Sequence, residues 1–113
     1  MAGKNNDLMN IDMIVKELTQ KIAEKFGDRV EQVILFGSHT RGEANEGSDL
    51  DVLIIGDVGL DEVIEITYPL SLKHGIYISP TVMTRYYFEM LKDEGASFVK
   101  NVLREGVVAY GRA

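Results

Sequence analysis

The fold is decided by residues 30–56, which read VEQVILFGSHTRGEANEGSDLDVLIIG. Apolar runs at Val30–Phe36 and at residues 49–55 predict two short buried strands, the second suited to a sheet that is covered on both faces. The polar residues 38–48 between them predict a loop, or one helical turn followed by a loop. Because no full crossover helix fits between these strands, we expect a mixed sheet and not a fully parallel one.

Helices are predicted on both sides of this segment. From Asn10 to Phe26 apolar residues recur at three- and four-residue steps, the spacing of an amphipathic helix with one face on a core. Residues 60–73 repeat that spacing, although Pro69 is expected to break or bend the helix, and Gly75 is suited to cap its end.

The C-terminal third predicts a further strand and two shorter helices. Residues 76–83 have strand character, and Thr84 and Ser97 are suited to cap helices over residues 85–91 and 98–104. Residues 107–110 predict a last short strand or an extended tail. The order of elements predicts a mixed α+β fold of the αβαβαβ kind, with helices packed on a small central mixed sheet.

Length and charge limit the classes of function. The 113 residues suit a single domain covering 1–113, and 18 acidic against 12 basic side chains give a net charge of -6. Such a surface repels phosphate backbones, so general nucleic-acid binding is not expected. No apolar run approaches the roughly 20 residues of a membrane span, the N-terminus is polar, and cysteine is absent. We therefore expect a cytoplasmic protein without membrane attachment.

Two acidic residues mark the start of the second predicted strand. Asp49 and Asp51 are two residues apart, and because strand side chains alternate, both carboxylates are expected on one face. Two hard oxygen ligands on a rigid face are typical of a Mg²⁺ site that takes its other ligands from water and phosphates. The pair alone would equally suit an ordinary turn, but its distance from Gly37 and Ser38 favours the metal site.

The residues around the predicted turn suit a phosphate ligand. Gly37 lets the backbone bend sharply and approach a ligand closely, and Ser38 offers a hydroxyl and an amide at the start of the turn. Arg41 can give a phosphate a fixed positive fork, or it can be a solvated loop charge. Ser48 can cap the turn or donate a hydrogen bond to a nucleotide.

Three other ligand-binding schemes fail on the sequence. Gly37 and Gly42 have the spacing of a P-loop, but Glu and Ala at positions 43–44 stand where Lys and Ser or Thr are required. The acidic pair does not continue into a calcium loop, because Leu53 and Ile55 occupy positions that need oxygen ligands. No Gly-x-Gly-x-x-Gly follows the first strand, so a dinucleotide fold has no support.

With these motifs in view, the chain resembles the minimal nucleotidyltransferases, small members of the DNA polymerase β-like superfamily. Gly37-Ser38, ten further residues and Asp49-x-Asp51 match the family's pattern at its typical spacing, and Arg41-Gly42 and Ser48 match frequent companions. The resemblance extends from the first helix to the closing residues 104–111. It implies transfer of a nucleoside monophosphate, with ATP as the expected donor, to an acceptor with release of pyrophosphate.

The resemblance also implies roles and a partner. Asp49 and Asp51 would hold Mg²⁺ on the triphosphate, while Gly37 and Ser38 would seat its β and γ phosphates. Family members of this size often pair with a helical HEPN-type toxin, and some act as antitoxins by adenylylating it. The acceptor is therefore expected to be, or to be presented by, another protein. Homo-oligomerisation through a sheet edge or through residues 86–88 remains open.

One departure from the family pattern affects the expected activity. The superfamily usually has a third carboxylate on the next strand, but residues 76–82 read IYISPTV and hold no acid. Tyr77, Ser79 and Thr81 share a face there, and none is a strong metal ligand. Either a carboxylate from elsewhere in the chain supplies the missing group, with Asp57 and Glu65 as candidates, or the second metal binds poorly. The alternative to an active transferase is a nucleotide-binding module that works as a docking or regulatory subunit without turnover.

Overall fold

A computed structural model describes residues 2–37, 40 and 49–111, with side-chain burial given from Ile11 onward. The elements along the chain are helix α1 (Ala2–Phe26), the 3-10 helix η1 (Gly27–Arg29), strands β1 (Val30–Phe36) and β2 (Leu50–Gly56), helix α3 (Leu60–His74), strand β3 (Ile78–Met83), helices α4 (Arg85–Asp93) and α5 (Ser97–Glu105), and strand β4 (Val107–Gly111). No helix in this described part combines the length and apolarity that a membrane crossing requires.

The four strands form one mixed sheet in the order β3-β2-β1-β4, which confirms the predicted fold class. β1 runs antiparallel to both β2 and β4, whereas β2 and β3 are parallel and are joined through α3. Phe36 at the end of β1 pairs with Asp51 at the start of β2. The antiparallel pairing therefore brings the two halves of the motif, far apart along the chain, to the same end of the sheet.

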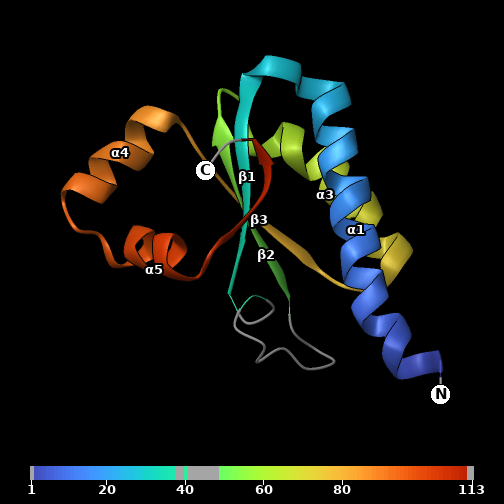
Figure 1. The fold of residues 1–113 in the computed structure, drawn as a ribbon. Helices are drawn as coiled ribbons and strands as arrows, with labels where there is room; N and C mark the ends of the chain where they lie inside the picture. Colours follow the sequence, from blue (N-terminus) through green and yellow to red (C-terminus); the bar gives the residue numbers. More distant parts are fainter. Residues whose placement is uncertain (1, 38–39, 41–48, 112–113) are drawn as a thin grey trace.

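Helices cover both faces of the sheet (Figure 1), with α1 and α3 on one face and α4 and α5 on the other. Side chains of β2 alternate between two cores: Leu50, Val52 and Ile54 pack against α1 and α3, while Leu53 and Ile55 pack toward α4 and α5. All five are fully buried. The expectation of a strand covered on both faces is confirmed, and burial of both faces explains its continuous apolar run.

Of the two effects predicted for Pro69, a break or a bend, the break is wrong, because helix α3 continues from Leu60 to His74. Pro69 cannot donate a hydrogen bond to the carbonyl of Glu65, but both residues are exposed, so water can hydrate that carbonyl. The opposite face of the helix is anchored by buried Val63, Ile66, Thr67 and Leu70. Packing of this face outweighs the lost backbone hydrogen bond.

The predicted helix ends are partly right. Gly75 caps α3 with a φ of 68° and donates its N–H to Ser71 at 2.9 Å, and the Thr84 side chain accepts the N–H of Tyr87 at 3.1 Å. The cap predicted at Ser97 is wrong. Helix α5 begins one residue earlier, with Lys100 donating its N–H to the Ala96 carbonyl, so Ser97 is already helical.

Candidate functional site

The bend after β1 and the start of β2 form the candidate site. Gly37 follows Phe36 with a φ of 86°, a backbone conformation that L side chains rarely adopt. A Cβ placed on Gly37 would overlap the Oδ2 atom of Asp51. Two independent constraints, the backbone angle and the close carboxylate, therefore require glycine at this position.

The bend is also held by a residue that the sequence analysis did not single out. The hydroxyl of Thr40 donates to the Gly37 carbonyl at 2.8 Å, and the Thr40 backbone N–H donates to the same oxygen at 3.1 Å. A Thr three residues after a turn glycine is a recognisable signal for such a bond. These two hydrogen bonds tie Thr40 to the carbonyl of Gly37.

Alternation along β2 places the two acidic residues. Leu50 is fully buried toward α1 and α3, so Asp51 after it points toward the other face of the sheet. Asp49 directly precedes β2, and alternation predicts the same face for it. Asp51 is half-buried and lies beside Phe36, whose ring meets the Phe98 ring edge-on at a centroid distance of 5.3 Å. Asp49 is exposed. The strand thus carries the half-buried carboxylate of Asp51, and the exposed carboxylate of Asp49 directly precedes it.

The donor chemistry of these groups suits a magnesium ion. Carboxylate oxygens are preferred ligands of Mg²⁺, and a strand holds their spacing fixed. Because Gly37 has no side chain, the Asp51 carboxylate can lie directly against the backbone of the bend. Among the described residues no three His, Cys, Asp or Glu side chains gather as a candidate metal cluster, so Asp49 and Asp51 would need water or substrate to complete a coordination sphere.

The other predicted site residues are placed only in part. Ser38, Arg41 and Ser48 lie outside the described residues. Ser79 stands opposite Asp51 in the parallel β2–β3 register, at a half-buried position. Thr81 stands opposite Leu53 one step further, and β3 carries no acidic residue.

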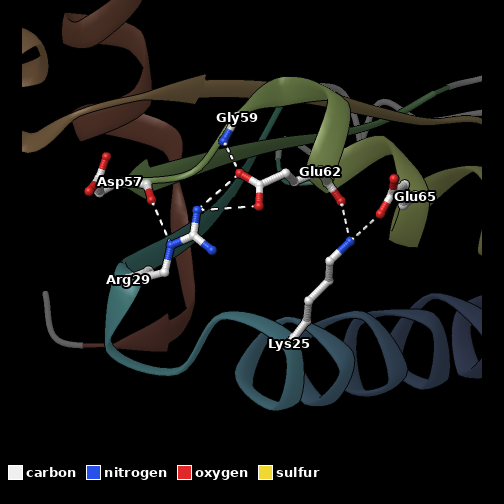
Figure 2. A network of polar contacts seen from close by, with 6 residues as sticks. All are labelled: Lys25, Arg29, Asp57, Gly59, Glu62 and Glu65. Atoms are coloured by element: carbon white, nitrogen blue, oxygen red, sulfur yellow. Dashed lines mark hydrogen bonds and ion pairs between the residues drawn. The ribbon is translucent and has the colours of Figure 1, made fainter.

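The two substitutes expected for a third carboxylate are wrong. Asp57 follows the far end of β2, six residues and roughly 20 Å of extended chain from Asp51. Glu65 lies on α3 and forms an ion pair with Lys25 (Figure 2). Both belong to the opposite end of the sheet because β2 runs straight away from the site.

That opposite end holds a polar network that fastens α1, η1 and α3 together (Figure 2). The Glu62 carboxylate accepts the Gly59 N–H at 2.9 Å and the Arg29 guanidinium at 3.0 Å. Arg29 also donates to the Asp57 carbonyl at 3.0 Å, and Lys25 donates to the Glu62 carbonyl at 3.1 Å. The Gly59 hydrogen bond, followed by that of Arg29, lowers the pKa of Glu62 below its usual range.

The chain is similar to known proteins in sequence and in fold. The model of the nucleotidyltransferase domain family matches residues 15–109. The chain belongs to this family, which confirms the resemblance and the enzyme class, nucleotidyltransferase, that it indicated. The matched range contains the Gly37 bend, both acidic residues and all four strands except the end of β4.

Two relatives and one solved structure illustrate the match. A candidate protein adenylyltransferase of Methanocaldococcus jannaschii, MJ0604, is 41% identical over 102 residues, covering 90% of this chain and 100% of that one. The protein adenylyltransferase MntA of Thermococcus cleftensis is 31% identical over 100 residues, covering 88% and 93%. A crystal structure of a toxin-antitoxin with AMP-PNP superposes with a TM-score of 0.54 at 19% identity, covering 84% of this chain and 72% of that one, which shows a shared fold.

Proposed function

We propose that this chain is a Mg²⁺-dependent protein adenylyltransferase that moves AMP from ATP to a hydroxyl group on a partner protein. The observation that carries the proposal is the contact between the Gly37 bend and the Asp51 carboxylate, which joins the two halves of the family motif at one end of the sheet. The names of the two relatives, both given as protein adenylyltransferases, support AMP as the transferred group and protein as the acceptor.

In this proposal each motif residue has a separate task. Asp49 and Asp51 hold Mg²⁺, which when bound offsets charge on the triphosphate. Gly37 admits the β and γ phosphates next to its backbone, and Ser38, Arg41 and Ser48 donate hydrogen bonds to the nucleotide. Phe36 and Phe98 form the apolar floor beside Asp51. A rigid strand and a tight bend thus keep the α-phosphorus in line with the incoming acceptor oxygen.

The proposed reaction is an in-line displacement at the α-phosphorus. The acceptor hydroxyl oxygen forms a bond to the α-phosphorus of ATP while the bond from that phosphorus to the bridging oxygen breaks, and pyrophosphate leaves with the electron pair. The hydroxyl proton passes to solvent water, because β3 offers Ser79 and Thr81 where a carboxylate base would stand. Proton removal without a dedicated base would make turnover slow.

The same position on β3 favours the second candidate function. With Ser79 opposite Asp51, the chain presents two carboxylates, which suffice to bind Mg²⁺-ATP but leave a second metal poorly held. The alternative is therefore a nucleotide-binding module that docks or regulates a partner without turnover. In either role we propose a helical HEPN-type toxin as partner, supported by the fold shared with a toxin-antitoxin structure. Consumption of ATP also fits the cytoplasmic location expected from the sequence.

Transfer of label from ATP tests the proposal. The purified chain is incubated with Mg²⁺, ATP labelled at the α-phosphate and the protein encoded beside it, and label on protein is measured after gel separation. Wild type is expected to transfer label, and the double variant Asp49→Asn with Asp51→Asn is expected to lose at least roughly 1000-fold in rate. Asp57→Asn, which removes an acid from the far end of β2, is the matched control and should transfer normally.

Calorimetric titration with Mg²⁺-ATP separates the two candidate functions. Binding without transfer by wild type would support the module, whereas binding with transfer supports the enzyme. Transfer that survives in the double variant would show that the site lies elsewhere on the chain.

A further inference from the structure

Tyr77 lies at the same end of the sheet as the candidate site. It directly precedes β3, and its carbonyl accepts the Leu50 N–H at 2.9 Å, so it extends the pairing of β2 and β3 by one residue. The next residue, Ile78, donates its N–H to the hydroxyl of Ser71 on α3, also at 2.9 Å. The peptide unit between Tyr77 and Ile78 is therefore held at both its carbonyl and its N–H, which fixes the point from which the tyrosine side chain projects.

The neighbours of Tyr77 show on which face its ring lies. Ile76 and Ile78 both pack against the core that includes α1 and α3, whereas Tyr77 between them is 58% exposed. Alternation therefore places Tyr77 on the other face, together with Ser79, which stands opposite Asp51 in the β2–β3 register. A diagonal neighbour on an adjacent strand is about 7–8 Å away, within reach of an aromatic side chain. The phenol of Tyr77 can thus approach the Asp51 carboxylate.

The strand order separates the two sides of the proposed reaction. β2 lies between β1 and β3. In the proposed function the β and γ phosphates lie beside Gly37 at the end of β1, and the metal lies at the start of β2. In an in-line displacement the acceptor oxygen enters opposite the leaving pyrophosphate. With pyrophosphate on the β1 side, the acceptor enters from the β3 side, where Tyr77 lies.

The chemistry of a phenol suits this position. β3 has no acidic residue to serve as a base, and its own hydroxyls, Ser79 and Thr81, are short and half-buried. A phenol gives up its proton to water more readily than an aliphatic hydroxyl does, so it depends less on a dedicated base. Tyr77 is therefore the hydroxyl side chain around the start of β3 that combines reach, exposure and reactivity.

We propose that Tyr77 accepts AMP from the active site of its own chain when no partner protein fills the acceptor side. This inference rests on the proposed function. In the step, the Tyr77 Oη atom forms a bond to the α-phosphorus of ATP, and the bond from that phosphorus to the bridging oxygen breaks. Pyrophosphate leaves with the electron pair, and the phenolic proton passes to water. The attached AMP then covers the acceptor side, so the modification stops at one AMP per chain and slows transfer to a partner.

Labelling of the chain without any partner tests the inference. The mass of the purified chain is measured first, since AMP already present on Tyr77 is a positive result. The chain is then incubated with Mg²⁺ and ATP labelled at the α-phosphate, and the labelled residue is mapped by peptide mass spectrometry. Wild type should take up one AMP on Tyr77, and Tyr77→Phe, which keeps the ring, should lower self-labelling at least about tenfold.

Two other tyrosines provide matched controls. Tyr68 on α3 and Tyr86 on α4 are 60% and 80% exposed, so exposure alone would favour them over Tyr77. Tyr68→Phe and Tyr86→Phe should label at the wild-type rate, because neither residue lies at the start of β3. Thermal unfolding at the wild-type temperature would show that all three variants are folded.

A mixed reaction tests whether the transfer occurs within one chain. A tagged double variant, Asp49→Asn with Asp51→Asn, keeps the Tyr77 hydroxyl but lacks the acidic pair. It is mixed with Tyr77→Phe, which keeps the acidic pair but lacks that hydroxyl. The tagged variant should stay unlabelled, because Tyr77 is placed beside the acidic pair of its own chain. The labelled fraction of wild type at a given time should also be independent of protein concentration.

The outcomes separate this inference from the proposed function. Label on the partner protein without label on the chain alone would overturn self-modification and leave the proposed function intact. No label on either protein would overturn both. Label that maps to Tyr68 or Tyr86, or that persists in Tyr77→Phe, would show that Tyr77 is not the acceptor. Labelling of the tagged double variant as fast as wild type would refute transfer within one chain.

Discussion

The two ends of the β1–β2 pair use carboxylates in opposite ways. At the far end, Glu62 and Glu65 contact Arg29 and Lys25 and fasten helices to one another (Figure 2). At the near end, Asp51 lies against the glycine bend, which has no side chain to keep the carboxylate away, and exposed Asp49 precedes the strand. Clustered acids therefore do not by themselves define a site. The near end differs from the far end because its carboxylates lie beside a tight backbone bend and not beside cationic side chains from neighbouring helices.

Among single substitutions, the largest expected effect comes from a side chain at Gly37 that would displace the Asp51 carboxylate. Gly37→Ala combines a φ of 86° with an overlap of the new Cβ and the Asp51 carboxylate, so Asp51 must move. Displacement of a reactive group by about 1 Å can cost roughly 100-fold in rate, and we expect at least that loss of AMP transfer. Rates from single-turnover assays with labelled ATP measure it.

Gly27→Ala is the control from the other end of the sheet. Gly27 also has a positive φ, 54°, but nothing lies within 4 Å of the position of its Cβ. The variant should lose about 1 kcal/mol of stability and keep its transfer rate. Equal loss of transfer in both variants would mean that backbone strain, and not the overlap with Asp51, explains the effect.

The second expected effect is a gain in Mg²⁺ affinity at the near end, produced by adding an acidic residue. Ser79 stands opposite Asp51 in the β2–β3 register, so Ser79→Asp brings a third carboxylate beside the first two. Because cation affinity rises with the number of charged ligands, Mg²⁺ affinity is expected to increase roughly three- to tenfold, measured by calorimetry with Mg²⁺ and ATP. Ser79→Asn, of the same size but neutral, should leave the affinity unchanged, and a gain with Asn would refute the charge argument.

Much of the fold could be predicted from local signals. The apolar run in β2, the periodic faces of α1 and α3 and the caps at Gly75 and Thr84 each follow from side-chain chemistry that acts within a few residues. A helix break at Pro69 and a cap at Ser97 are the two wrong predictions about the fold. Tertiary packing keeps α3 intact through Pro69, and α5 begins one residue earlier than the sequence indicates. Neither effect is visible in a single sequence.

The site was predictable as a motif but not as a geometry. The turn chemistry singled out Gly37, whose positive φ and closeness to Asp51 the structure shows, whereas a shared face for Asp49 and Asp51 stays a prediction. Asp57 and Glu65 do not supply a third acid, because both lie far from Asp51 in space. The direction of β2 and the ion pair between Glu65 and Lys25 show this separation, and neither can be read from the sequence alone.

The third expected effect is a pH-dependent change in stability, and it concerns the Glu62 carboxylate at the far end. The pKa of Glu62 is lowered below its ordinary value of 4.5 by the Gly59 N–H and then by Arg29, so the unfolded state binds the proton more readily. The stability from this group is present above pH 4.5 and is lost as the pH falls through the lowered folded pKa. Glu62→Gln should therefore lower Tm by a few degrees at neutral pH, and the difference should shrink in acid.

Asp61→Asn is the matched control for this titration, because it removes a charge from the same helical turn without removing the Arg29 contact. At every pH, the Tm of Asp61→Asn should lie closer to that of wild type than the Tm of Glu62→Gln does, as measured by circular dichroism. A Glu62→Gln difference that stays constant down to strongly acidic pH would show that its cause is packing and not ionisation.

The smallest effect is expected for Glu65→Gln. Its carboxylate pairs with Lys25, but the two side chains are 72% and 34% exposed, so the loss should stay below roughly 0.5 kcal/mol. Mg²⁺-ATP affinity should change less than about twofold, since β2 separates Glu65 from Asp51 by most of its length and the intervening side chains are apolar and buried. Calorimetry of the variant beside wild type measures this. A fivefold or greater loss of affinity would mean that the two ends of the sheet are coupled, and the far-end network would then belong to the machinery that positions Asp51.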